Sequence, residues 1–371
     1  MLTGKIKTAT AKLENLKGNA IGTLKKNDLV KILERRPDSR LRVDAASKQG
    51  FVKTASIDID FVGETIPLEA KASDLRRVGN DYIGPEGWFA VHAKYKGDEG
   101  PKNSGVMTVS DFVAANPKKF ANVPPSQVRV LKASSANEGN LEAINAYDNA
   151  FLSPGILQWT VGTNTGEGEL AGLLDRLKTL DAATFNLYFG QDGLDIEMKP
   201  ASPGAVRTGF LVLGGKKLVQ PSDKNKMRQP LWVYRFWRAA HDNTYRLCQL
   251  LHAVGRIDVF YTRPLPKPPG LTLKDFITSE YGVALLLDQH VNRPGHVPKT
   301  VLTAINGYKE KDPKTWTSDD ERAVIKAYLK ARAATNMTDS DKRAASIAKS
   351  VATGDLSDER GSYGTTGGTG P

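Results

Sequence analysis

The first sixty residues differ in texture from everything that follows them. Apolar side chains recur there in short alternating runs, and Gly, Asn and Asp separate one run from the next. Alternation with a period of two is typical of strands, and turn residues between such runs mark hairpins. The pairs that set the pattern are Ile6 and Thr8, Val30 and Ile32, Leu41 and Val43, and Phe51 and Val52. We therefore expect residues 1–60 to form a small antiparallel β-barrel.

Helical periodicity dominates the rest of the chain. Apolar residues recur at spacings of three and four, and two segments begin at capping-box sequences. The predicted helices cover residues 169–180, 230–254, 272–288, 318–334 and 338–352. The fold class we expect is a multidomain protein, an all-β barrel followed by a mainly α (α+β) domain. Its parts are the barrel at 1–60, a connector at 61–85, the main domain at 86–360 and a flexible Gly-rich tail at 361–371.

Length and charge set bounds on the class of protein. The chain has 371 residues, of which 40% are hydrophobic, and this is enough for two or three domains with a sizeable core. The formal net charge is +11, which favours a polyanionic partner. Nucleic acid, an acidic membrane surface and an anionic cell wall all satisfy that charge.

Cysteine and histidine usage argues against a metal centre. A single cysteine, Cys248, excludes an internal disulfide framework and a multi-cysteine metal site, and its apolar surroundings predict a buried structural thiol. The five histidines form no metal-ligand spacing, so we expect no metal and no cofactor. The chain also has no run of about 18 apolar residues and begins without a secretory signal, so we expect synthesis in the cytoplasm and no membrane span.

The segment from Pro124 to Thr160 carries the clearest chemistry. A helix pattern ends at Glu138-Gly139, a short hairpin follows with Asp148, and then comes Gly155-Ile156-Leu157-Gln158-Trp159. Cleavage of a glycosidic bond uses one protonated carboxyl and one ionised carboxylate. A glutamate at a helix C-terminus opposes the helix dipole, which favours its protonated form, while an aspartate on a polar hairpin stays charged.

This order of elements resembles the lysozyme superfamily, in particular chitosanase-like and phage-type muramidases. The resemblance implies that Glu138 is the general acid, that Asp148 is the second carboxylate and that Gln158 is a cleft residue near the sugar. Trp159 is a candidate sugar-stacking platform, although an aromatic residue on a strand is more often part of the core. Three other carboxylates compete for the second role, namely Glu142, Glu167 and Glu169.

A second stretch resembles the distal wall of the cleft in chitosanase-like enzymes. It is the predicted helix end Asp288-Gln289-His290-Val291-Asn292, which is followed by Gly295. The resemblance makes Asp288, His290 and Asn292 candidate substrate contacts. The alternative is a helix-ending turn held by Asp and Asn side chains.

The predicted barrel resembles bacterial Src-homology-3 (SH3) domains. The similarity rests on residues 21–28 with Val30, and on Gly50-Phe51-Val52 where those domains close with Gly-Trp-Val. Such modules accompany wall hydrolases and hold them on peptide stems. The alternative is a spacer or a docking module without affinity for the wall.

Three hypotheses follow. The first is a cell-wall glycosidase of the endolysin or muramidase kind that cuts β-1,4 bonds in peptidoglycan, with chitosan as the other possible substrate, after lysis, holin release or injection brings it to the wall. The second is an inactive glycan-binding or structural part of a phage-like tail or injection apparatus. The third is a nucleic-acid binder, supported only by the basic and aromatic residues 234–238. That stretch is too apolar for an exposed groove, so we expect no nucleic-acid partner.

Overall fold

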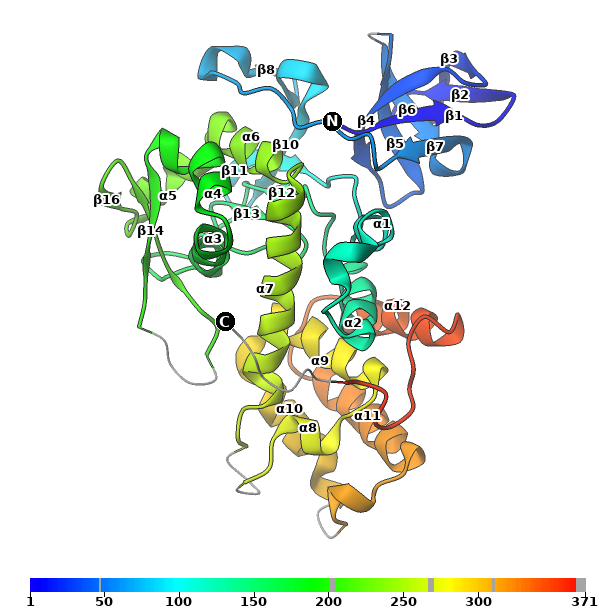
Figure 1. Cartoon of the computed structure of the whole chain (residues 1–371), viewed down its shortest axis with the longest axis vertical. Coiled ribbons are helices and arrows are strands. Elements are labelled where there is room, and N and C mark those ends of the chain that lie inside the picture. The colour runs from blue at the N-terminus through cyan, green and yellow to red at the C-terminus, as the bar shows by residue number, and fades with distance from the viewer. Residues whose placement is uncertain (47, 201–204, 266–269, 309–310, 365–371) are drawn as a thin grey trace. The chain divides into compact units, whose positions relative to one another are not determined.

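A computed structural model describes residues 1–46, 48–200, 205–265, 270–308 and 311–364 (Figure 1). The chain divides into two compact units. The first consists of Met1–Ala115, Gly139–Lys199 and Arg207–Gln249, and the second of the described residues of Asn116–Glu138, Pro200–Val206 and Leu250–Pro371. Antiparallel sheets make up residues 3–103, and the region after them is mostly helical, so the coarse prediction of a multidomain α+β protein is confirmed.

The first sixty residues form a seven-stranded antiparallel sheet in the order β3-β2-β6-β5-β4-β1-β7. Its strands are β1 (Thr3–Ile6), β2 (Thr10–Glu14), β3 (Ala20–Lys25), β4 (Leu29–Arg35), β5 (Arg40–Ala45), β6 (Lys48–Lys53) and β7 (Ile57–Asp60). Alternate residues of β5 are buried, which confirms the strand periodicity. A closed barrel is not seen, because no ladder among the described residues joins the edge strands β3 and β7.

A second antiparallel sheet has the strand order β13-β12-β11-β10-β9-β8. It is built from β8 (Arg76–Val78), β9 (Asp81–Ile83), β10 (Phe89–Tyr95), β11 (Asp98–Asn103), β12 (Ile144–Asn145) and β13 (Ser153–Pro154). The expected connector therefore contributes a hairpin, β8–β9, to this sheet. The pairing of β12 with β13 forms the hairpin that the sequence predicts around Asp148.

The remaining elements of the first unit are mainly helices. They are α1 (Val109–Ala115), α3 (Glu169–Leu180), α4 (Ala182–Tyr188), β14 (Leu194–Met198), β15 (Gly209–Leu213), β16 (Lys216–Lys217), α5 (Pro221–Lys224) and α6 (Pro230–Ala239). The helix predicted over 169–180 is confirmed as α3. The single helix predicted over 230–254 is wrong, because α6 ends and α7 (Asn243–Tyr261) begins anew. The Asp242 side chain accepts from the Thr244 N–H at 2.6 Å, and this bond opens α7.

The second unit is a helical assembly. Its helices are α2 (Pro125–Ser135), the C-terminal half of α7, α8 (Leu273–Phe276), α9 (Glu280–Asn292), α10 (Val297–Ala304), α11 (Ser318–Ala333) and α12 (Ser340–Ala352). The last two confirm the predictions over 318–334 and 338–352, although the capping box of α11 starts at Thr317 and not at Ser318. The helix predicted from residue 272 is two helices, because the Ser279 hydroxyl accepts from the Gly282 N–H and starts α9.

The end of the described chain packs against this helical unit. The Tyr363 N–H donates to the Thr278 carbonyl at 2.9 Å, and the Tyr363 ring lies edge-on to Tyr261. Residues 361–364 are therefore anchored and do not belong to the flexible tail that the sequence predicts, while residues 365–371 of that prediction lie outside the described residues.

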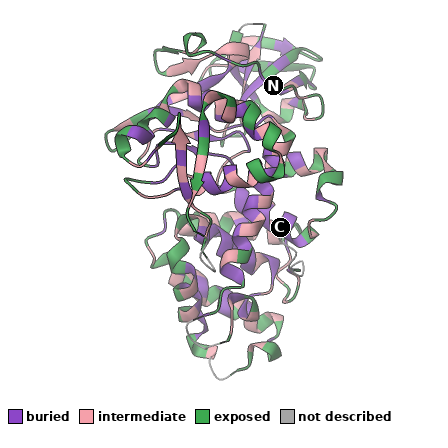
Figure 2. Cartoon of the chain, turned by 60° about the vertical axis from the view of Figure 1, so that its left-hand side comes forward, coloured by how far each residue is buried: buried purple, intermediate pink, exposed green. Residues whose placement is uncertain are grey.

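Apolar side chains fill the interior of both units, and exposed positions gather on the outer sides of helices and strands (Figure 2). Cys248 is fully buried, and burial raises the pKa of its thiol to about 12, as expected for a structural cysteine. Among the helices of the described residues, none has both the length and the apolar character needed to traverse a bilayer.

Candidate active site

Glu138 lies just past the end of α2. The N–H groups of Asn137 and Glu138 donate to the carbonyls of Ser134 and Ser135, at 3.1 and 3.0 Å, so the chain continues the helical course for one more turn. This places the Glu138 carboxyl at the C-terminal end of the helix, as the sequence predicts. Its side chain is only 12% exposed.

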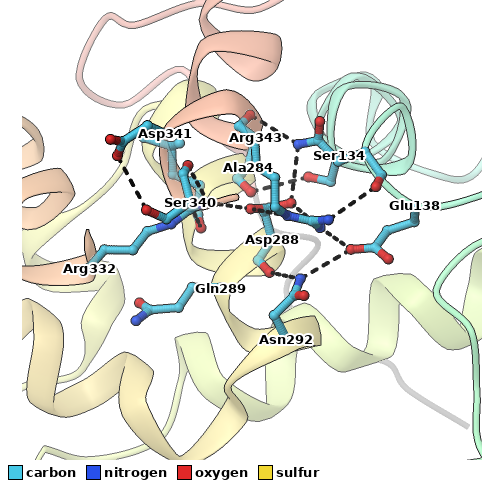
Figure 3. A network of polar contacts seen from close by, with 12 residues as sticks. Ser134, Glu138, Ala284, Asp288, Gln289, Asn292, Arg332, Ser340, Asp341 and Arg343 are labelled. Carbon is cyan, nitrogen blue, oxygen red and sulfur yellow. Dashed lines mark hydrogen bonds and ion pairs between the residues drawn. The ribbon is translucent and has the colours of Figure 1, made fainter. Parts of the chain in front are cut away.

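Two other helices bring polar groups to this carboxyl (Figure 3). Asn292 of α9 donates through Nδ2 to Glu138 Oε1 at 3.2 Å and to the carbonyl of Asp288 at 3.0 Å. Arg343 of α12 donates through Nη2 to Glu138 Oε1 and, at 2.6 Å, to Asp288 Oδ1. The structure thus brings together Glu138, Asp288 and Asn292, three of the residues that the sequence singles out.

Asp288 anchors the group from behind. Its carboxylate is completely buried between two guanidinium groups, because Arg332 of α11 donates to its Oδ2 at 2.5 Å. Asn137 adds a third donor at 3.2 Å. Two carboxylates thus face two arginines, which balances the buried charge. In the structure Asp288 supports the two arginines that surround it, and its role as a substrate contact stays a prediction.

The two oxygens of the Glu138 carboxyl have different surroundings. Both the Arg343 and the Asn292 bonds reach Oε1. Among the contacts of the described residues, no hydrogen bond reaches Oε2. The carboxyl is therefore held by one oxygen, while the other is available for a proton or a ligand.

Burial and neighbouring charges set the protonation of Glu138. Burial raises its pKa and is the largest influence, the Arg343 guanidinium lowers it, and the Asp288 carboxylate raises it again. The net pKa of Glu138 is raised above that of an ordinary glutamate. A raised pKa is the property that a proton donor near neutral pH requires.

The other predicted residues of the hairpin belong to the first unit. Asp148 lies in the turn between β12 and β13, where its Oδ1 accepts from the Ala150 N–H at 3.0 Å. Gln158 has a positive φ of 53°, and its amide is held at both ends by Gly155 and Asn145. It lies in the turn of residues 155–158.

Two predicted substrate contacts are buried in the structure. Trp159 is 1% exposed, a position typical of core packing and not of a sugar platform. His290 is 5% exposed, accepts from Arg256 Nε at 3.1 Å through its Nδ1, and packs its ring on Phe260. Although His290 shares α9 with Asp288 and Asn292, its side chain faces a different part of the second unit.

One group of the described residues has the composition of a metal site. Ligand atoms of Glu64, Glu142 and His241 lie within 4.8 Å of one another. The Arg246 guanidinium lies among them and forms ion pairs with both carboxylates, and the N–H groups at positions 106 and 107 donate to Glu142 Oε2 at 2.9 Å. These bonds occupy the carboxylate oxygens, and the guanidinium balances one of the two negative charges, so the group is a buried ion-pair cluster. It also removes Glu142 as a competitor for the catalytic role.

Sequence reasoning missed Arg343, Arg332 and Asn137. Arg343 and Glu138 are 205 positions apart in the chain. The sequence of α12 predicts a helix but contains no motif that points to a functional site. The i, i+4 spacing of Asp288 and Asn292 did place them on one face of α9.

Comparisons of this chain with family models, with curated proteins and with solved structures gave no match. The site's own geometry must therefore carry the functional argument.

Proposed function

We propose that this protein is a lysozyme-like glycoside hydrolase that cleaves β-1,4 bonds in peptidoglycan, with Glu138 as the general acid. The observation that carries the proposal is the asymmetric setting of the Glu138 carboxyl. One oxygen is fixed by two donors, the other accepts no hydrogen bond from the described residues, and burial raises the pKa of the group.

The neighbours of Glu138 can stabilise its protonated carboxyl before the proton is donated and its carboxylate afterwards. Burial favours the protonated carboxyl before the reaction. Once the proton passes from Oε2 to the glycosidic oxygen, the new carboxylate is stabilised by Arg343 and Asn292, which already hold Oε1. The two influences oppose each other, and because burial is the larger one, the pKa of Glu138 is raised above that of an ordinary glutamate.

Asp148 supplies the second carboxylate of the proposal, as the family resemblance implies. It lies in the turn of the β12–β13 hairpin, where it is partly exposed to solvent. In this role it orients the attacking water or stabilises the developing positive charge on the sugar.

The N-terminal sheet is assigned to wall attachment in this proposal, as an SH3-like module. Residues 1–60 contain thirteen Lys and Arg against seven Asp and Glu, so this part carries much of the net charge of +11. A basic module of this kind suits an anionic wall. The protein would reach that wall after lysis, holin release or injection.

The Arg343 ion pair favours a second candidate function. A permanent pair with Arg343 would keep Glu138 ionised, and the chain would then be an inactive glycan-binding or structural component of a phage-like tail or injection apparatus. A chitosanase differs from the main proposal only in substrate.

The test compares the release of reducing ends from purified peptidoglycan and from chitosan by wild type and by Glu138→Gln. Glutamine keeps the shape of the side chain but cannot donate the proton, so we expect a loss of about 10³-fold. Glu197→Gln is the control, because Glu197 is an exposed carboxylate of β14 that pairs with Lys217. If wild type releases no ends from either polymer, the enzyme proposal is wrong and the binding function stands.

A further inference from the structure

The positive charge of the N-terminal sheet divides into paired arginines and unpaired lysines. Residues 1–60 contain four arginines and nine lysines. Every one of these arginines forms an ion pair with a carboxylate, at 2.7 to 3.6 Å: Arg35, Arg36, Arg40 and Arg42. Among the described residues, Lys7 is the only one of the nine lysines with a carboxylate partner, Asp58 at 3.4 Å. The unbalanced charge of the sheet is therefore carried by eight exposed lysines.

The β2–β3 hairpin presents two of these lysines on a face without a free carboxylate. Its inward side chains are buried, so the alternate positions of both strands point outward. The register places the outward residues in two opposite pairs, Thr10 with Lys25 and Lys12 with Thr23. Lys12 and Lys25 are thus diagonal neighbours, within reach of one another's long side chains. The carboxylate on these two strands, Glu14, is paired with Arg40 at 3.5 Å.

The lysines of this hairpin repel one another. Lys26 follows Lys25 directly, and Lys17 lies in the turn between the strands, so two further positive charges flank the diagonal pair. Like charges at neighbouring positions of a sheet are destabilising, and a bound anion relieves that cost. Lysines on an edge strand also prevent pairing with another sheet. That role does not account for Lys12, because β2 is paired with a strand on each side, β3 and β6.

The surroundings of the lysines favour a chain of phosphates without bases. Phe51 is the only aromatic residue among residues 1–60, and it is buried. The sheet therefore has no exposed ring on which the bases of a single-stranded nucleic acid could stack. A lysine ammonium is a compact point charge that suits phosphate, and the hydroxyl groups of Thr10 and Thr23 can donate to phosphate oxygens beside it.

We infer that the outer face of the β2–β3 hairpin binds a linear phosphodiester polymer of the bacterial wall, in which polyols separate the phosphates. The hairpin lies at one edge of the sheet, where β3 has no further neighbour among the described strands (Figure 1). A chain can therefore run along it without meeting another strand. The inference rests on the proposed function for the wall and deepens it, because the SH3 resemblance alone implies a peptide ligand.

A second lysine pair of the same sheet provides a matched contrast. Lys5 of β1 and Lys31 of β4 are also diagonal neighbours on an outward face. Here, however, Asp58 lies opposite Lys5 and Asp44 lies opposite Lys31. These carboxylates repel a phosphate chain, so the second pair should contribute little to binding although it carries the same charge.

The experiment measures binding of the full chain to fluorescein-labelled poly(glycerol phosphate) by fluorescence anisotropy at several salt concentrations. We expect saturable binding that weakens as the salt concentration rises, because bound lysines release counterions from the phosphates. The double variant Lys12→Gln, Lys25→Gln should bind about tenfold more weakly and with a shallower salt dependence. Lys12→Arg, Lys25→Arg keeps both charges and should bind like wild type. Lys5→Gln, Lys31→Gln makes the same change in net charge and should weaken binding by less than about twofold.

Three results would overturn the inference. They are an absence of saturable binding, an equal loss of affinity in the two glutamine variants, and tighter binding of DNA than of the polyol polymer through Lys12 and Lys25. The four substituted positions are exposed, so thermal unfolding should show wild-type stability for each variant.

The binding readout does not depend on hydrolysis. Polymer binding through Lys12 and Lys25 by a protein that releases no reducing ends from peptidoglycan would refute the enzyme proposal and leave the hairpin site standing. Release of reducing ends without polymer binding would do the reverse.

Discussion

Arg343 donates through Nη2 to Oε1 of Glu138, and through the same nitrogen to Oδ1 of Asp288. One guanidinium thus connects the proposed acid to the buried carboxylate behind it. Since Asp288 has a second arginine, Arg332, the charge of Arg343 remains available to Glu138.

Replacing Arg343 should change the pH dependence of the acid. Arg343 lowers the pKa of Glu138, so Arg343→Gln should raise that pKa and keep the carboxyl protonated to higher pH. The groups that act on Glu138 are Arg343 from α12 and Asp288 and Asn292 from α9, and Arg343 has the only positive charge among them. We expect the alkaline limb of the pH–activity profile to move up, with the same shift in a carboxyl-carbon NMR titration of Glu138. Arg343→Lys keeps a positive charge and should shift both less. An unchanged NMR titration in Arg343→Gln would contradict the assignment.

Asp288 should matter for stability more than for substrate affinity. The variant Asp288→Asn leaves Arg332 without its buried counter-charge and leaves Arg343 paired with Glu138 alone, and breaking a buried pair in this way costs about 3–5 kcal/mol. Thermal and denaturant unfolding measure the change. Asp341→Asn, at an exposed position, should change the free energy of unfolding by less than about 0.5 kcal/mol. Equal stabilities of the two variants would show that the buried pairs do not form.

The buried cluster of the first unit should make stability depend on acid pH. Burial opposes the charge of Glu64, but the bond from His241 and the Arg246 guanidinium outweigh it and lower the pKa of Glu64 from 4.5 to about 2. A lowered folded-state pKa gives stability that is present above pH 4.5 and is lost as the pH falls through 4.5 toward 2. The shift corresponds to roughly 3 kcal/mol.

Denaturant unfolding of wild type and Glu64→Gln between pH 2 and 7 tests this point. The variant should be less stable at pH 7 and should show a flatter pH dependence below pH 4.5. Lys7 and Asp58 form an exposed pair at 3.4 Å, so Asp58→Asn is a matched control that should keep the wild-type pH dependence. Parallel curves for wild type and Glu64→Gln would rule out the cluster as the source.

The fold shows which features local sequence patterns can predict. The strands of residues 1–60 and helices α3, α11 and α12 follow from periodicity and capping, since both signals depend on neighbouring residues. The break between α6 and α7 was missed because a continuous apolar pattern masks the cap that Asp242 provides. Closure of the sheet was wrongly predicted because it depends on pairing between distant strands.

The candidate site shows the same division. The position of Glu138 at a helix end and the helix that ends at Asp288–Asn292 are local features, so the sequence predicts them. That Asp288 is buried by Arg332 and Arg343, and that Arg343 holds Glu138, depends on helices far apart in the chain. No local sequence pattern shows these contacts between distant helices. The sequence therefore predicts Asp288 only as a substrate contact, whereas in the structure it holds Arg343, which binds Glu138.

The most direct measurement of the central claim is the identity of the ends released from purified peptidoglycan, reduced with borohydride and analysed by mass spectrometry. Wild type should produce new reduced amino-sugar ends, and Glu138→Gln at equal concentration about 10³-fold fewer. The same yield of ends from both proteins would show that Glu138 is not the acid. No new sugar ends from wild type would contradict the glycosidase assignment.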